Sequence, residues 1–236
     1  MNTTDTINIH PYHPVGVEIP GYLANSLPVR TLLVSFFTGC AVILGTAFYF
    51  LQWKRPNLSR GDVLTGLWFA LCGFIHFFFE GYFAYNFQTI GGSSHLFGQL
   101  WKEYSLSDSR YLTRDAFVTC MEAVTAIFWG PLSFTCVYLI ATDHPLRHPL
   151  QSIVSLGQLY GDVLYYATCA FERHVAGRVH CRPESFYYWA YYMLCNSFWI
   201  VIPFVLVCRS AQATARAFAR VRELEPGTKH SIKKTS

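Results

Sequence analysis

Charged residues are scarce in this sequence. Asp, Glu, Lys and Arg together make up 14% of its 236 residues, whereas a soluble domain carries about 25%. Hydrophobic residues make up 52%, and the mean hydropathy is +0.25. This balance argues against a soluble domain and indicates an integral membrane protein.

Several familiar patterns are missing as well. The eight cysteines contain no CxxC pair, so neither a disulfide framework nor a zinc site is predicted. His174, His180 and Cys181 are near in sequence, but their spacing fits no standard metal site. The lack of a Gly-rich phosphate loop and of a basic–aromatic pattern argues against nucleotide and nucleic-acid binding. The N-terminus lacks the basic start and apolar core of a cleaved signal peptide.

Five apolar segments are each long enough to cross a membrane, which takes about 20 helical residues. They cover residues 31–52, 63–87, 115–142, 150–171 and 185–208. The sequence therefore predicts an all-α, polytopic membrane protein with a five-helix bundle over residues 31–208. Residues 1–30 are interpreted as an extended segment that packs on the membrane surface through Tyr12 and Tyr22. Residues 209–236 form a basic tail.

The second apolar segment carries two ionisable residues, His76 and Glu80, in the run CGFIHFFFEGY. Four residues apart on a helix, their side chains share a face and reach each other. A charge in mid-membrane costs on the order of 3 kcal/mol, so it is kept mainly where it faces a bundle interior or a cavity. We interpret the pair as part of a functional site. The alternative is a structural hydrogen bond that locks two helices together.

The third segment supplies a second intramembrane carboxyl group. Glu122, Thr125 and Trp129 fall at i, i+3 and i+7 of CMEAVTAIFWGPLS, on one helical face. Pro131 is expected to kink the helix just beyond this face, and Gly130 gives the kink room. Glu122 is therefore expected to face the same interior as His76 and Glu80.

The fourth segment contains GQLYGDVLYY. Gly157 and Gly161 are four residues apart, which predicts close helix contact. Asp162 is a third intramembrane acid, and we predict that it forms a structural network with Gln158 and Tyr165. The sequence does not assign this group to the functional site.

Residues 86–114 form a longer polar loop that contains LWKEYSLSDSRY. Loops of this length are uncommon without a role. The loop could act as a lid over a pocket or form an ordered turn, and the sequence leaves both readings open.

The distribution of Lys and Arg predicts the orientation. A cytosolic tail places 11 of the 18 on the cytosolic side: Lys54, Arg55, Arg60, Arg147, Arg209, Arg216, Arg220, Arg222, Lys229, Lys233 and Lys234. The other 7 are Arg30, Lys102, Arg110, Arg114, Arg173, Arg178 and Arg182. This asymmetry favours a cytosolic C-terminus and a lumenal N-terminus. The final KKTS then resembles a dilysine retrieval signal of the endoplasmic reticulum.

An intramembrane ligand cavity is expected where these residues meet. Asn196 and Trp199 of the fifth segment are predicted to line it, although plain packing is the alternative for Trp199. Aromatic and aliphatic walls predict a lipid-like ligand, and an ionised carboxylate with an aromatic face would stabilise a cation. The residues alone predict either an enzyme that transfers protons to a lipid or a receptor for amphiphilic cations.

The motifs CGFIHFFFEGYF, LWKEYSLSDSRY, CMEAVTAIFWGPLS and GQLYGDVLYY, followed by Asn196 and Trp199, resemble the emopamil-binding protein family. These are the sterol Δ8–Δ7 isomerases of the EXPERA superfamily, and the resemblance covers about residues 60–205. It implies five transmembrane helices, an endoplasmic-reticulum membrane location, a homodimer and binding of cationic amphiphilic drugs. It also implies a sterol substrate within membrane lipid, and the reaction needs no metal or redox cofactor.

The resemblance also assigns the site. It implies catalytic roles for His76, Glu80 and Glu122. It implies substrate binding by Thr125, Asn196, Trp199, Tyr111 and Arg110. The family's reaction protonates carbon 9 of an 8,9 double bond, passes through a carbocation at carbon 8 and removes a proton from carbon 7.

Two alternatives stay open at this point. A non-catalytic member of the superfamily that binds sterols or cationic amphiphiles would keep the same acids. A transporter would use them as a proton relay, but five spans without an internal repeat argue against the usual transporter architecture.

Overall fold

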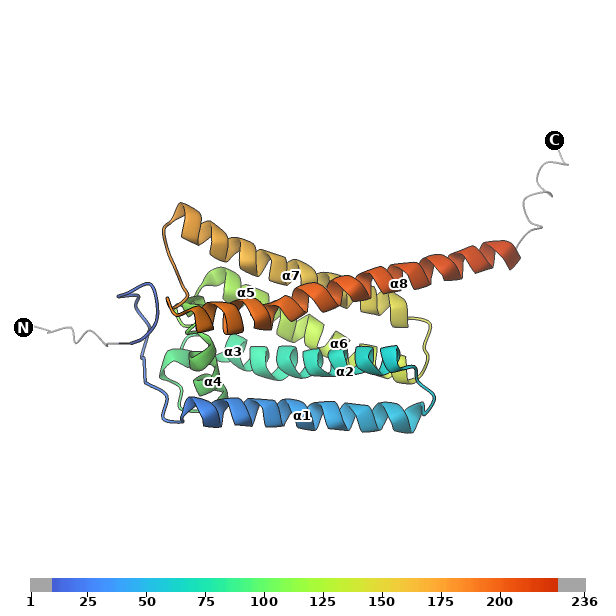
Figure 1. The fold of residues 1–236 in the computed structure, drawn as a ribbon, viewed down its shortest axis with the longest axis horizontal. Helices are drawn as coiled ribbons and strands as arrows, with labels where there is room; N and C mark the ends of the chain where they lie inside the picture. Colours follow the sequence, from blue (N-terminus) through green and yellow to red (C-terminus); the bar gives the residue numbers. More distant parts are fainter. Residues whose placement is uncertain (1–9, 225–236) are drawn as a thin grey trace, which may run out of the picture.

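The computed structural model describes residues 10–224. Within this range the chain forms helices joined by loops, without a strand, and its long helices run lengthwise through the molecule (Figure 1). Each of these long helical units is here called a rod, and the first rod is α1, Val29–Lys54. The second rod joins α2 (Arg60–Phe74), a π-helical segment (Ile75–Glu80) and α3 (Gly81–Asn86) end to end. The all-α prediction is confirmed.

The remaining rods are built in the same way. The third joins α5 (Ala116–Val124), a π-helical segment (Thr125–Trp129) and α6 (Gly130–Ala141). The fourth is α7, Arg147–Val175. The fifth joins a π-helical segment, Tyr187–Cys195, to α8, Asn196–Leu224. Short polar side chains start two of the rods, because Ser59 and Asp115 accept the backbone N–H groups of Asp62 and Val118.

Within residues 10–224, four of these rods are apolar and long enough to cross a membrane: Val29–Lys54, Arg60–Asn86, Ala116–Ala141 and Tyr187–Leu224. The fourth predicted segment is helical too, within the 29 residues of α7. Its buried face carries polar side chains, which lower its hydropathy below that of the other rods. That α7 also crosses the membrane stays a prediction, and its length is sufficient.

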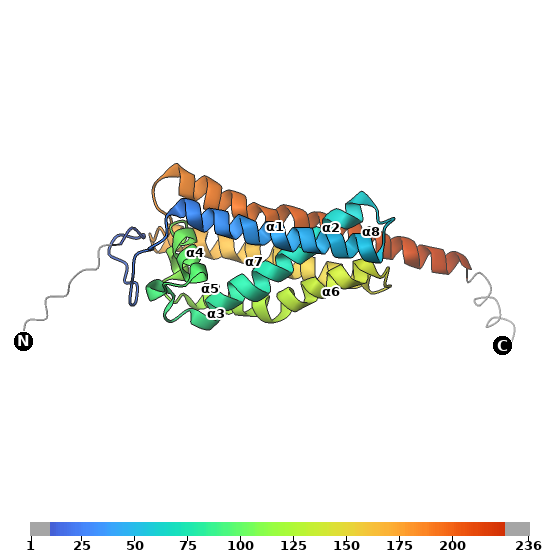
Figure 2. The ribbon, with the colours of Figure 1, turned by 90° about the horizontal axis from the view of Figure 1, so that it is seen from below.

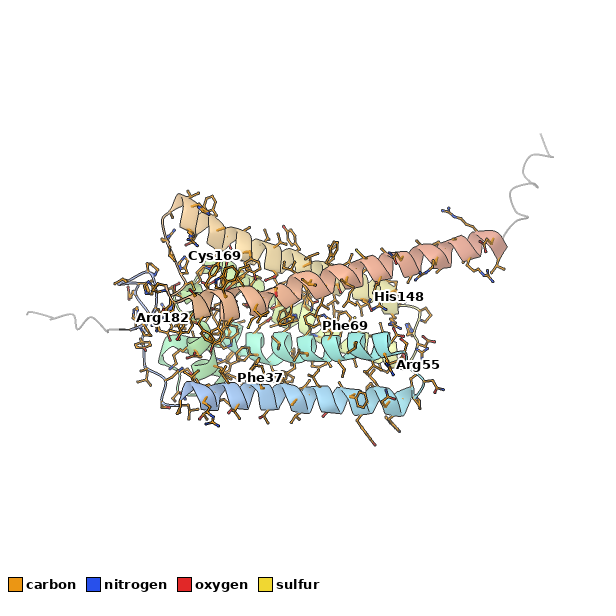
Figure 3. All side chains as sticks on the ribbon, viewed as in Figure 1. Phe37, Arg55, Phe69, His148, Cys169 and Arg182 are labelled. Carbon is orange, nitrogen blue, oxygen red and sulfur yellow. The ribbon has the colours of Figure 1, made fainter. Side chains whose placement is uncertain are left out.

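Large apolar side chains point outward along the rods. Phe37 of α1 is 64% exposed (Figure 3), and Ile127 and Phe204 on other rods are also exposed. An apolar exterior of this extent is expected for helices that face lipid.

The loops alternate between the two ends of the bundle (Figures 1 and 2). Residues 10–28, α4 (Leu96–Tyr104) and the loop between α7 and the fifth rod lie at one end. The α1–α2 and α6–α7 loops lie at the other end, where Arg55 and His148 are seen in Figure 3. At that end α8 projects beyond the other helices. The helix therefore does not stop at residue 208, where the sequence placed the start of the tail.

The loop of residues 86–114 folds into the end of the bundle. Helix α4 buries Leu100, Trp101 and Glu103, and a 3₁₀ turn, Ser109–Tyr111, follows it. Trp101 stacks on Phe79 of the second rod with ring centroids 4.6 Å apart. The loop is thus an ordered element of the core.

The N-terminal segment packs on this same element. Tyr12 is 5% exposed, and its hydroxyl donates to the backbone oxygen of Lys102 at 3.0 Å. Tyr22 packs edge-on against the Tyr12 ring at 5.7 Å. The predicted contact of these tyrosines with the membrane surface is therefore wrong for Tyr12, because α4 offers it both an aromatic neighbourhood and a free carbonyl.

Candidate active site

Two π-helical segments, Ile75–Glu80 and Thr125–Trp129, pack against each other in the interior. Gly130 makes this approach possible, since a β-carbon there would lie 2.9 Å from the backbone nitrogen of Phe77. Pro131 follows directly and lacks the N–H that a regular helix would use, which disturbs the helical hydrogen bonds at the expected place. Single π turns are frequent at functional sites.

His76 and Glu80 form the predicted pair within the first π segment. The Nδ1 atom of His76 lies 2.6 Å from Oε2 of Glu80. The two residues are only 3% and 9% exposed. The prediction that they share a face and reach each other is confirmed.

The other ring nitrogen of His76 meets two side chains from different rods. Gln158 Nε2 of α7 lies 3.1 Å from His76 Nε2, and Trp199 Nε1 of α8 lies 3.4 Å from it. An indole N–H is only a donor, so His76 Nε2 is an acceptor here. The proton of a neutral His76 then sits on Nδ1 and points at Glu80.

Thr125 links the two glutamates. Its Oγ1 lies 2.6 Å from Glu80 Oε2, 2.8 Å from the backbone oxygen of Glu122 and 3.4 Å from Glu122 Oε2. A hydroxyl has one proton to donate and lone pairs that accept. Thr125 can therefore donate a hydrogen bond to the Glu80 carboxylate while its lone pairs accept one from a protonated Glu122. His76, Glu80, Thr125 and Glu122, here called the acid cluster, form one hydrogen-bonded chain.

Tyr111 completes the acid cluster from the loop. Its hydroxyl donates to Glu122 Oε1 at 2.8 Å, and the residue is 4% exposed. Burial, together with the nearby Glu122 carboxyl, raises the pKa of Tyr111 well above its ordinary value. The phenol therefore stays protonated and acts as a donor to Glu122.

Asn196 begins α8 just after the π segment Tyr187–Cys195, beside the acid cluster rather than within it. Its Oδ1 accepts the Tyr104 hydroxyl at 3.1 Å, and its Nδ2 donates to the backbone oxygen of Tyr192. The Tyr104 and Tyr111 rings pack edge-on at 5.5 Å. Asn196 is thus connected to Glu122 through two tyrosines.

Trp199 lies between the acid cluster and the hydrophobic core. Its ring is edge-on to His76 at 6.2 Å and tilted against Trp68 at 5.3 Å. It therefore packs in the core and touches His76, and its role in lining a ligand cavity stays a prediction.

Arg110 has a different position from the other predicted site residues. It is 1% exposed, and its Nε and Nη2 atoms both bind the carboxylate of Asp108. Its Nη1 donates to Thr168 Oγ1 of α7 at 2.9 Å. These bonds fasten the loop to α7 and do not include the acid cluster.

The predicted network around Asp162 is not present. Neither Asp162 Oδ2 nor the Tyr165 hydroxyl has a hydrogen-bond partner among residues 10–224, and Gln158 turns to His76 instead. Gly157 makes the expected close contact, since a β-carbon there would lie 2.4 Å from the Trp129 ring, whereas Gly161 faces open space.

Two neighbours of the site escaped sequence reasoning. The spacing of four residues indicates Asp162 as the partner of Gln158, and Tyr104 stands out in the sequence only as part of the loop motif LWKEYSLSDSRY. The contacts of Gln158 with His76 and of Tyr104 with Asn196 each join two elements that are far apart in sequence. Helical periodicity reports only neighbours within one helix. Among residues 10–224, no three His, Cys, Asp or Glu side chains gather in a group that could hold a metal.

The arrangement is suited to moving protons in an apolar interior. Two carboxyl groups on one hydroxyl in a low-dielectric site favour a state that holds one proton between them, because two like charges at this distance repel strongly. The ionised partner and the face of a nearby tryptophan would stabilise a cation.

Comparison with known proteins agrees with this chemistry. The family model described as EBP, from the EXPERA (expanded EBP) superfamily, matches residues 96–210. A mouse (Mus musculus) 3-beta-hydroxysteroid-Delta(8),Delta(7)-isomerase is 41% identical over 207 residues, which are 87% of this chain and 88% of the mouse protein.

Plant proteins are similar as well. A probable isomerase of the same name from rice (Oryza sativa subsp. japonica) is 34% identical over 89% of this chain and 94% of its own. A protoglabretal synthase of Citrus sinensis is 36% identical over 78% of this chain and 86% of its own.

Proposed function

The chain belongs to the EBP family of the EXPERA superfamily, and on this premise we propose that it is a sterol isomerase of sterol biosynthesis. It moves a double bond from the 8,9 to the 7,8 position of the sterol nucleus. A proton is added at carbon 9, a carbocation forms at carbon 8, and a proton leaves carbon 7. No net oxidation occurs.

The observation that carries this proposal is the hydrogen-bonded chain from His76 through Glu80 and Thr125 to Glu122. A double-bond shift of this kind needs a proton donor, a proton acceptor and a negative group near the developing cation. The acid cluster contains all three within one buried region.

The proposed roles follow from the contacts. His76 and Glu122 supply and relay the proton, and Glu80 stabilises the carbocation and shares in proton removal. Thr125 orients the two carboxyl groups, and Trp199 presents its ring to the cation. A coupled pair titrates as a unit, so the two glutamates act as one acid–base system.

The substrate-binding roles are proposed separately. Tyr111 holds Glu122 with its hydroxyl, and Asn196 orients the tyrosines around it. Arg110 contributes to binding by holding the loop that carries Tyr111, through Asp108 and Thr168.

Turnover in deuterated water tests the reaction directly. Purified protein is incubated with a Δ8-sterol, and the product is analysed by mass spectrometry and NMR. A Δ7-sterol with one deuterium at carbon 9 is expected, because the added proton comes from exchangeable groups and the lost one from carbon 7. An unchanged sterol that binds with measurable affinity would favour the non-catalytic reading.

The proposal includes cationic amphiphiles as ligands. An amine on an apolar ring system resembles the carbocation, and its ammonium group would be attracted by Glu80 and Trp199. Equilibrium binding of a radiolabelled cationic amphiphile, competed by the sterol substrate, tests this. Binding without competition would place the amine elsewhere.

We also propose a homodimer in the endoplasmic-reticulum membrane with a cytosolic C-terminus and a lumenal loop 86–114. The Lys and Arg asymmetry supports the orientation. A tag after Ser236 should be cleaved by protease added to sealed microsomes, and its full protection would reverse the orientation. The mass of the protein in detergent, corrected for bound detergent, tests the dimer.

The dilysine end, Lys233 and Lys234, lies outside the described residues. Replacing both with Ser is expected to let part of the protein leave the endoplasmic reticulum while membrane turnover is kept. An unchanged distribution would assign retention to another part of the chain.

A further inference from the structure

A cavity lies at the end of the bundle that carries α4, away from the acid cluster. Its volume is about 580 Å³, and it opens between the last turns of α7, the following loop and the π segment Tyr187–Cys195. Cys169 and Arg182, both labelled in Figure 3, line it from α7 and from the loop. No member of the acid cluster lines it.

The polar lining of this cavity is strongly one-sided in charge. Of the residues that the structure describes, six basic or imidazole side chains and no carboxyl group line it: Arg173, Arg178, Arg182, His13, His174 and His180. Such a lining attracts anions and repels cations. It differs in this respect from the acid cluster, which is proposed to stabilise positive charge.

Nearby carboxylates neutralise only part of this charge. Arg182 pairs with Glu184, with Nε 3.0 Å from Oε2. Glu172 is shared between His180 at 2.7 Å and Arg178 at 3.4 Å.

Two other basic side chains that line the cavity have no such partner within the described part of the chain. Arg173 and His174 make no ion pair or side-chain hydrogen bond with any residue from 10 to 224. The cavity therefore keeps an excess of positive charge that an incoming anion can neutralise.

Exposed apolar side chains occur among the residues that line the cavity and next to them in sequence, and they are here called its rim. Phe171 and Val175 of α7 are 63% and 68% exposed, and Trp189 on the opposite side is 63% exposed. Tyr188 and Tyr192 also line the cavity. Tryptophan and tyrosine gather at the depth of the lipid headgroups, so this rim is expected to meet the membrane interface.

We propose that this cavity binds the phosphate headgroup of an anionic membrane lipid. The guanidinium groups of Arg173 and Arg178 bind the phosphate oxygens, for which their planar donors are well shaped. The acyl chains lie along the exposed apolar surface of α7 and Trp189. The lipid bridges α7 and the fifth rod where the two diverge in Figure 1. This binding is independent of sterol turnover.

The test uses the full-length protein in a neutral detergent. Phosphatidic acid is titrated into the micelles, with phosphatidylcholine and inorganic phosphate as separate arms. Melting temperature and native mass spectrometry report binding. A ligand that binds only the folded state raises the melting temperature in a saturable way, and we expect this for phosphatidic acid alone.

Two double variants distinguish lipid binding in the cavity from non-specific attraction of an anionic lipid to positive charge on the protein. Arg173→Gln with Arg178→Gln removes the proposed contacts. Arg216→Gln with Arg220→Gln removes the same charge from the exposed end of α8, where Arg220 has an equally loose pair with Glu223 at 3.5 Å. Arg216, like Arg173, makes no ion pair within residues 10–224. All four side chains are exposed, so both variants should fold.

The cavity variant is expected to need at least ten times more phosphatidic acid for half of the melting shift, and the α8 variant should match the original protein. Equal losses in the two variants would assign binding to net charge and overturn the proposal. An equal response to inorganic phosphate would show a free-phosphate site instead of a lipid site. No shift and no retained lipid would also overturn it.

Discussion

Two rows of buried polar side chains face each other in the bundle, and they differ in how their polar atoms are partnered. In the acid cluster, both nitrogens of His76, the Thr125 hydroxyl and carboxyl oxygens of both glutamates have partners within hydrogen-bond reach. On the inner face of α7, Ser155 Oγ and Asp162 Oδ2 have none among residues 10–224.

The difference separates preorganisation from simple burial. Fixed partners hold a charge or a proton in one place, and catalysis depends on such fixed groups. A buried polar atom without a partner costs free energy and directs nothing. Substitutions of like chemistry in the two rows should therefore have very different effects on turnover.

The largest effect is expected for the glutamates. Glu80→Gln and Glu122→Gln keep the side-chain shape but remove the ionisable group. Loss of one well-placed electrostatic group costs about 3–4 kcal/mol in the transition state, or about 100- to 1,000-fold in turnover. We expect a loss of this size with sterol binding retained, measured as kcat and sterol affinity on the same preparation. The affinity for a cationic amphiphilic amine should fall in parallel.

Glu103→Gln is the matched control. Glu103 of α4 is also buried and accepts the Tyr191 hydroxyl at 3.1 Å, but it lies outside the acid cluster. Burial raises its pKa, so its ionised form is disfavoured in the folded state and stability falls as pH rises. The Gln variant should keep turnover and keep or raise the melting temperature at neutral pH. Well-folded Glu80 and Glu122 variants with near-normal turnover would refute the mechanism.

A tyrosine pair gives the next largest contrast. Tyr111 and Tyr165 are both buried with ring centroids 6.2 Å apart, but among residues 10–224 the Tyr111 hydroxyl has a partner, Glu122, and the Tyr165 hydroxyl has none. A hydrogen bond to a charged or polarised group contributes about 1.5 kcal/mol, which is about ten-fold in rate. Tyr111→Phe should lower kcat about ten-fold, whereas Tyr165→Phe should leave it unchanged. Equal effects would mean that the hydroxyl of Tyr111 has no role in turnover.

Gln158 belongs to both rows and should give an intermediate effect. Its Nε2 contacts His76, whereas its Oε1 has no hydrogen-bond partner in the described range, residues 10–224. Gln158→Met keeps the volume and removes the donor, which is worth about 1 kcal/mol, or about five-fold in kcat. Because the amide helps to set the tautomer of His76, the pH profile of kcat should shift while KM for the sterol stays constant. A change in KM alone would point to a packing role.

Sequence periodicity could predict the parts of the site that belong to single helices. His76 with Glu80, and Glu122 with Thr125, follow from spacings of four and three residues, because those spacings place side chains on one face. The five apolar segments were also predicted correctly as helices, because the scarcity of charge and the run lengths are local properties. The burial of α4 depends on tertiary packing, which these local properties do not report. The helix α8 continues to Leu224 because the residues after 208 favour helix formation.

Contacts between rods could not be predicted in this way. The π-helical turns alter the angle between successive side chains, so a regular 3.6-residue wheel misplaces the residues beyond them. Gln158 lies on the regular helix α7, where a spacing of four residues indicates Asp162 as its neighbour, but its partner is His76 on the second rod. The link between Tyr111 and Glu122 also joins two elements, because the loop that carries Tyr111 is positioned by Arg110, Asp108 and Trp101.

The smallest effect is expected for Asp162, the third acid. Asp162→Asn makes the same chemical change as the glutamate substitutions, but at a carboxyl group with an oxygen that has no partner among residues 10–224. Turnover should stay within about two-fold, because removing a group that contacts no reacting chain leaves the transition state unchanged. Replacing a buried carboxyl by a neutral amide also lowers the cost of burial, so the melting temperature should stay or rise by about 2–4 °C per kcal/mol gained. A loss of turnover comparable to that of Glu80→Gln, in protein with an unchanged melting temperature, would break the comparison and add Asp162 to the acid cluster.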